Sequence, residues 1–325
     1  MNLERVDQIA KAVLYEGYML YPYRPSSVKN RQRFNFGVLY PRSYSEAQGA
    51  SEPSAMQIEC LVSGGAGALL EAKLRFLQLQ TRTRQQSQGT APDEWEEVVE
   101  RTITAAACSV DELCRAKKGM EFAFQDEATF ESCGPEGTRV RRRLARVDGI
   151  IEVSAEKIRQ DLFKIRVNIR NNTPMDGSEP RDEALMHSLV STHVILGVES
   201  GEFVSLLEPP EELGEIAAEC QNTGAWPVLV GDAGYRDTML ASPIILYDYP
   251  QIAPESAGDL FDGTEIDEIL SLRIMTLTDE EKREIRASDD RARQILERTE
   301  NMPAEQFMKL HGTVRGMRPL KEDIR

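Results

Sequence analysis

Apolar residues that recur at every second position predict a series of β-strands between residues 55 and 172. The clearest strand covers residues 162–169, where aromatic and β-branched residues alternate with polar ones. The alternation changes phase near Phe76 and Leu77, which predicts a β-bulge there. Several short strands of this kind are typical of a β-sandwich or an open barrel. Further strands are predicted at residues 56–62, 70–79, 95–106, 120–124 and 140–153.

Helical spacing of apolar residues marks the two ends of the chain instead. Residues 3–15 predict an N-terminal helix with one apolar face. Residues 264–274 predict a second helix, and a capping box of Thr278 and Glu281 begins a third that runs to about residue 299. A last helix begins at Pro303. Strands and helices that occupy separate parts of the chain predict an α+β fold.

The stretch from Trp226 to Ile274 contains the densest apolar run and the sharpest turn signals. It predicts a strand at residues 228–230 and, after Pro243, a second strand at residues 244–247. Two glycine-containing segments predict turns. Ser63–Gly67 lacks the spacing of a phosphate-binding loop and predicts a turn between strands, and residues 199–201 predict a hairpin.

These elements predict three parts of the chain. Residues 1–54 form an N-terminal helix and an aromatic, basic segment, and residues 55–172 form a β-rich domain. Residues 173–325 form an α+β C-terminal domain that ends in helices. The boundary is predicted at the polar, breaker-rich residues 171–181.

Two charged segments are candidates for a contact with a partner protein. The first is the aromatic-rich segment 15–44, whose cations can contact an acidic partner, cover the edge of the core or, less directly, stack on a nucleotide. The second is the acidic segment 251–270, where three carboxylates precede the predicted helix. They form either a solvated loop or a surface that docks a partner or binds a cation. The candidate residues are Arg24, Lys29, Arg31, Arg33, Glu255, Asp259 and Asp262.

Composition narrows the classes of function. The chain has 325 residues and a formal net charge of −15, which argues against nucleic-acid binding because phosphate contacts need a positive face. It shows no apolar run long enough for a membrane span and no signal-peptide core, so we expect a cytoplasmic protein. The five cysteines are scattered, so we expect reduced thiols and neither a disulfide nor a structural metal.

No catalytic or cofactor motif is evident. We therefore expect a protein that binds no cofactor, and we favour a non-catalytic protein over an enzyme. The three histidines lack the spacing of a zinc site, and no nucleophile elbow is present. The alternative is a metal-dependent enzyme that gathers Asp232, Asp237 and Asp248 near His193. Turn and capping roles explain the same aspartates without chemistry.

Three segments, AVLYEGYMLYPYRPSSVKNRQRFNFGVLYP (12–41), FVSLLEPPEE (203–212) and residues 226–285, resemble an uncharacterised bacterial family. Its members are encoded beside genes for uptake-type NiFe hydrogenases and their accessory proteins. The resemblance implies a non-catalytic accessory, assembly or scaffold role next to a hydrogenase subunit or its accessory proteins, and it transfers no catalytic residues. Self-association of the chain stays open.

Replacing Glu255, Asp259 and Asp262 together with Gln, Asn and Asn tests the docking interpretation of the acidic segment. The melting temperature should stay unchanged or rise slightly, because like charges repel in the folded chain. Association with the native partner should slow and lose salt dependence, because exposed interface charges act mainly on the association rate. Binding kinetics at two salt concentrations measure both effects. Unchanged association at low salt would leave the segment a solvated loop.

Overall fold

The structure is a computed structural model that describes residues 3–24, 27–85, 93–133, 138–252, 258, 260–261, 267–288 and 290–310. Two compact units are present. Unit 1 contains Met1–Tyr18 and Gln32–Gln251, and unit 2 contains Met19–Arg31 and Ile252–Arg325. The predicted boundary at residues 171–181 therefore lies inside unit 1. The physical reason is that strands on both sides of it pair with the same central strand.

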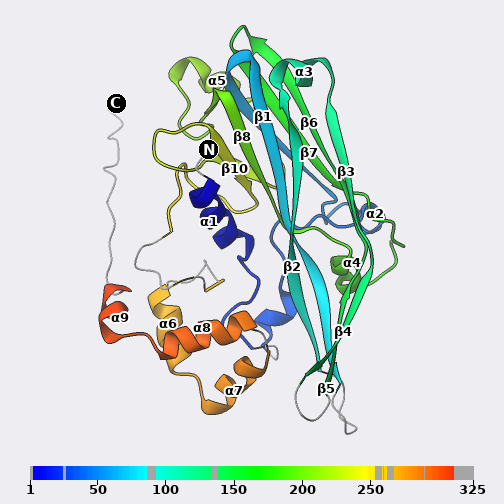
Figure 1. Ribbon diagram of the computed structural model, residues 1–325, viewed down its shortest axis with the longest axis vertical. Coiled ribbons are helices and arrows are strands. Elements are labelled where there is room, and N and C mark those ends of the chain that lie inside the picture. Colours follow the sequence, from blue (N-terminus) through cyan, green and yellow to red (C-terminus); the bar gives the residue numbers. More distant parts are fainter. Residues whose placement is uncertain are drawn as a thin grey trace. The chain divides into compact units, whose positions relative to one another are not determined.

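Unit 1 is built on an antiparallel sheet in which the described residues form ten strands (Figure 1). The α+β class predicted from the sequence is confirmed. The main order of the sheet is β3-β6-β7-β1-β8-β10-β9, with β2 and β5 also paired to β1 and β4 paired to β5. The strands are β1 (Ala55–Gln85), β2 (Asp93–Ser109), β3 (Lys118–Phe124), β4 (Glu127–Cys133), β5 (Thr138–Leu144), β6 (Val147–Arg159), β7 (Leu162–Asn171), β8 (Val190–Val204), β9 (Trp226–Leu229) and β10 (Thr238–Ser242).

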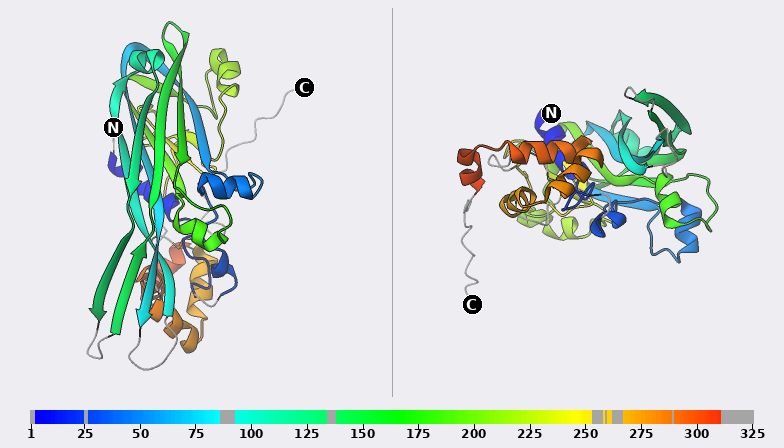
Figure 2. Two further views of the ribbon diagram at one scale, coloured as in Figure 1. Left: turned by 90° about the vertical axis from the view of Figure 1, so that its right-hand side faces the viewer. Right: turned by 90° about the horizontal axis from the view of Figure 1, so that it is seen from below.

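β1 is the central strand, and both of its edges are paired along most of its length. Residues 61–63 pair with β7 and β8 at once, and residues 69–77 pair with β2 and β8. β7 and β2 therefore follow one another along one edge of β1. β8 and β5 follow one another along the other edge, because residues 80–84 pair with β2 and β5. At the C-terminal end of β1, the strands β1, β2, β4 and β5 extend side by side (Figure 2).

The two predicted glycine turns are wrong, because β1 and β8 both continue through them. The two segments face each other, and the register between β1 and β8 shifts between Gly64 and Leu69. A Cβ atom added to Gly64 would lie 2.9 Å from the Cα atom of Gly201. The glycines thus allow two backbones to approach closely inside the sheet. A register shift lies near Phe76 as predicted, but the extra residue belongs to β8 and not to β1, because Arg75 pairs with His193 and Leu77 pairs with Val190.

The predicted strand at residues 244–247 is also wrong. The strand in this region is β10, which ends at Ser242, because Pro243 has no N–H for the ladder. Met239, Leu240 and Ala241 of β10 are fully buried. The four residues after Pro243 form no strand, and Ile245 is 76% exposed. The predicted strand at residues 228–230 matches β9.

Short helices surround the sheet within unit 1. The predicted N-terminal helix is α1 (Leu3–Leu14), which packs Val6 and Ala10 against Ile195, Val228 and Leu240. The others are α2 (Arg42–Ala47), α3 (Val110–Arg115), α4 (Arg181–Met186), α5 (Gly214–Ala218) and the 3₁₀ turn Glu211–Leu213.

The regular elements of unit 2 in the described residues are helices. Buried apolar side chains come from α6, α7 and α8, and the predicted capping box is confirmed at the start of α7. The Glu281 carboxylate accepts the backbone N–H of Thr278, and the Thr278 hydroxyl accepts the N–H of Glu281. The elements are α6 (Asp267–Met275), α7 (Asp279–Ser288), α8 (Asp290–Glu300), α9 (Ala304–Leu310) and the 3₁₀ turn Lys29–Gln32, whose last residue belongs to unit 1.

Replacing Phe76 with Ala should lower the free energy of unfolding by about 3–5 kcal/mol, because a fully buried ring leaves a cavity. Its ring lies 6.0 Å from that of Phe122 and 6.1 Å from that of Phe124. Denaturant unfolding measures the loss. Phe130→Ala is the matched control, because that ring is 72% exposed and should cost less than about 0.5 kcal/mol. Equal losses in the two variants would contradict a core centred on β1.

Candidate functional site

The predicted contact residues lie in different surroundings. Arg24, in unit 2, forms ion pairs with Glu281 and Glu284 at 3.2 and 3.7 Å. Lys29 is exposed, and the side chain of Arg31 lies outside the described part of the chain. The acidic members of the prediction are outside the described residues as well, namely Glu255, Asp259 and Asp262.

Arg33 is a structural residue of unit 1. Its side chain is only 3% exposed, and its guanidinium lies 3.7 Å from the centroid of the Trp95 ring. It donates to the Glu96 carboxylate at 3.1 Å and stacks on Phe34 at 4.6 Å. A desolvated guanidinium held between aromatic rings stabilises the fold by cation–π contacts and an ion pair. The surrounding tyrosines are also buried, among them Tyr15, Tyr18, Tyr40 and Tyr44.

The aspartates of the enzymatic alternative do not gather into a metal site. In the described ranges, no group of three or more His, Cys, Asp and Glu side chains is placed to hold a metal ion. Asp248 accepts hydrogen bonds from the Ser205 hydroxyl and from the backbone N–H of Leu229. Asp237 accepts the hydroxyl of Thr238. Asp248 therefore links segments that are 43 and 19 residues away in sequence, which is a tertiary role and not the local turn role expected from the sequence.

His193 and Ser242 form a buried pair that resembles part of a hydrolase site but lacks access to substrate. The Ser191 carbonyl lies 2.7 Å from His193 Nδ1, so that nitrogen carries the proton. Nε2 then accepts the Ser242 hydroxyl at 3.1 Å. Both residues are 0% exposed, and Ser242 also accepts the N–H of Ile244. The pair therefore holds β8 to the end of β10.

The best candidate for a binding site is a cleft of about 600 Å³ in unit 1, here named the Trp226 cleft. Its walls combine aromatic rings, prolines and backbone with two charged side chains. Register brings its parts together, since Trp226 pairs with Ser242 in β9 and β10, and the bridge from Leu39 to Leu189 fixes the segment before Tyr40. The cleft is lined by Asn35, Phe36, Gly37, Val38, Tyr40, Glu52, Pro53, Arg181, Gly224, Trp226 and Pro243.

Polar groups in the Trp226 cleft are few and fixed in place. Arg181 donates to the Asn35 side-chain oxygen at 2.7 Å. Burial raises the pKa of Tyr40 to about 12, and the Arg181 guanidinium opposes this rise. The phenol therefore stays protonated at neutral pH and can donate a hydrogen bond. One cation, Arg181, and one carboxylate, Glu52, therefore lie beside aromatic walls, an arrangement typical of ligand pockets.

Exposed apolar side chains continue from the cleft along the same part of the sequence. Trp226 is 42% exposed, Tyr235 64%, Ile245 76% and Tyr247 83%. Single exposed apolar residues are ordinary, but four large ones within residues 226–247 make this segment a candidate for contact with a partner. The sequence pattern did not predict these exposed side chains, because the apolar run after Pro243 assigned residues 244–247 to a buried strand.

No family model matches the chain, and a search of curated proteins finds no match. None of the helices that the structure describes is both long and apolar enough to cross a membrane.

Acid should destabilise unit 1 through His193. Burial lowers the pKa of His193 from 6.5 to about 4, so the unfolded chain takes up the proton first. The stability from the neutral ring is complete above pH 6.5 and is lost as the pH falls toward 4. The loss between pH 7 and pH 4.5 should be about 2–3 kcal/mol.

Urea unfolding of wild type and His193→Gln at the two pH values isolates this contribution. The variant should be less stable at pH 7 but should lose less between pH 7 and pH 4.5. If both proteins lose the same free energy of unfolding between pH 7 and pH 4.5, His193 is not the responsible group.

Proposed function

We propose that this chain is a non-catalytic accessory, assembly or scaffold protein that works through protein–protein contacts. The observation that carries the proposal is the Trp226 cleft, together with the exposed side chains of Tyr235, Ile245 and Tyr247. Tryptophan and tyrosine dominate the energetics of protein interfaces, because they bury a large area with little loss of side-chain freedom. The cleft is the place where such a contact would begin.

The occupant that fits best is an extended segment of a partner protein. Aromatic rings and prolines form grooves that bind extended peptides, since an extended chain presents alternate side chains to such walls. Phe36, Pro53, Trp226 and Pro243 supply these surfaces. Arg181 supplies a charged group for a carboxylate or a backbone carbonyl of the segment.

The sequence resemblance supports a hydrogenase subunit or a hydrogenase accessory protein as the partner, in the cytoplasm. The resembling segments 12–41 and 226–285 include most of the residues that line the Trp226 cleft. The acidic segment with Glu255, Asp259 and Asp262 stays a proposed second contact. The enzymatic alternative has less support, because its aspartates form no metal-binding group.

Trp226→Ala and Tyr247→Ala should each weaken binding of the native partner by at least about tenfold, as truncation of an interface hot spot does. Co-purification of a tagged chain from its host identifies the partner, and binding kinetics with the purified hydrogenase proteins give the affinities. Phe130→Ala removes an exposed ring from β4, outside the proposed surface, and should leave the affinity unchanged. Wild-type affinity in both Trp226→Ala and Tyr247→Ala would contradict the proposed surface.

A further inference from the structure

A second cavity lies inside the sheet of unit 1, between two strands that do not pair. β2 pairs with β1, and β3 pairs with β6, but β2 and β3 share no ladder in the described part of the sheet. α3 connects them, because β2 ends at Ser109 and β3 begins at Lys118. The space between these strands has a volume of about 390 Å³.

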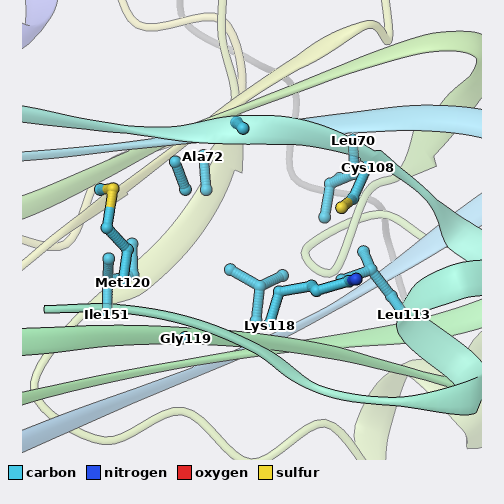
Figure 3. Close-up of a pocket in the computed structure, with 11 residues that line it drawn as sticks. Leu70, Ala72, Cys108, Leu113, Lys118, Gly119, Met120 and Ile151 are labelled. Carbon is cyan, nitrogen blue, oxygen red and sulfur yellow. The ribbon is translucent and has the colours of Figure 1, made fainter.

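The lining of this cavity is almost wholly apolar. Figure 3 shows Leu70, Ala72 and Cys108 on one wall, and Met120 and Ile151 on the opposite wall. Small side chains leave the space open where larger ones would fill it. The small residues are Ala72, Ala105, Ala106 and Gly119.

Lys118 is the one charged residue among those that line the cavity. It is exposed, so its ammonium can meet water and a bound ligand at the same time. No ion pair joins it to any residue that the structure describes, whereas its neighbour Lys117 pairs with Glu152. The cavity therefore combines apolar walls with one cation at its side.

The neighbouring thiol does not compete for that cation. Burial and a hydrogen bond with Glu112 raise the pKa of Cys108, so the thiol stays neutral at neutral pH. A neutral thiol behaves as a small apolar group and adds to the apolar wall.

We propose that this cavity binds a small amphiphile, with its apolar body between β2 and β3 and an anionic head on Lys118. Size supports the proposal, since a cavity of about 150 Å³ holds benzene and this one is more than twice as large. Cavities with apolar walls accept apolar ligands. The positive charge of Lys118 favours a ligand with a carboxylate or a similar anion over one with a cationic or neutral head group. The site is independent of the Trp226 cleft, with which it shares no lining residue.

Calorimetric titration of the full chain with octanoate, octanol and octylamine tests both features of the ligand. Octanoate should bind most tightly, octanol less tightly and octylamine least. Lys118→Met should weaken octanoate binding roughly fivefold and leave octanol unchanged, as expected for one exposed ion pair. Lys117→Met is the matched control, because it removes the same charge from the adjacent position outside the cavity, and octanoate should bind it as it binds wild type.

Ala72→Leu tests the place of binding, because the larger side chain fills the cavity from β1 and should weaken both octanoate and octanol at least tenfold. The rate of alkylation of Cys108, followed by peptide mass spectrometry, provides a second readout in the wild-type chain. Octanoate should slow the modification of Cys108 and leave that of Cys220 unchanged. The proposal is overturned if octanoate does not bind, if it binds Lys118→Met and wild type equally, or if Cys108 is not protected.

Discussion

The pairing of both edges of β1 is the constraint on which unit 1 depends. A strand of 31 residues pairs with four others that the structure describes, and each edge is used by two strands in succession. Unpaired backbone groups inside a fold are costly, so this arrangement fixes the positions of β2, β5, β7 and β8 together. It also explains why residues 55–251 lie in one unit, since strands from the predicted β-rich domain and from the predicted C-terminal domain meet on β1.

Much of the sheet could be predicted from the sequence, because alternation reports a strand that has one buried face. β7 and the phase change near Phe76 are read directly from this pattern. Glycine was misleading at Ser63–Gly67, where the same residue that permits a turn also permits the close approach of Gly64 to Gly201. Whether a glycine forms a turn or lies in a strand depends on which strands pair with it. A local sequence pattern does not identify those partner strands.

The candidate site was less predictable, because its residues are distant in sequence and because charge alone does not reveal burial. Arg33 belongs to a basic segment, yet its guanidinium lies between Phe34 and Trp95 inside unit 1. Trp226 and Tyr40 line one cleft only because of the register of β9 with β10 and the bridge at Leu39. A hydrophobic run after Pro243 reads as a buried strand, although its exposed side chains lie outside the sheet.

Both cavities follow from the way strands of the sheet end or separate. β2 and β7 occupy the same edge of β1, so β6 and β3, which continue from β7, run beside β2 without pairing to it. The gap between β2 and β3 is lined by small apolar residues and holds no chain segment of unit 1 that the structure describes. The Trp226 cleft forms where β10 stops at Pro243 and β9 starts at Trp226. The two cavities share no lining residue, so the proposed polypeptide and the proposed amphiphile would occupy separate places on the same sheet.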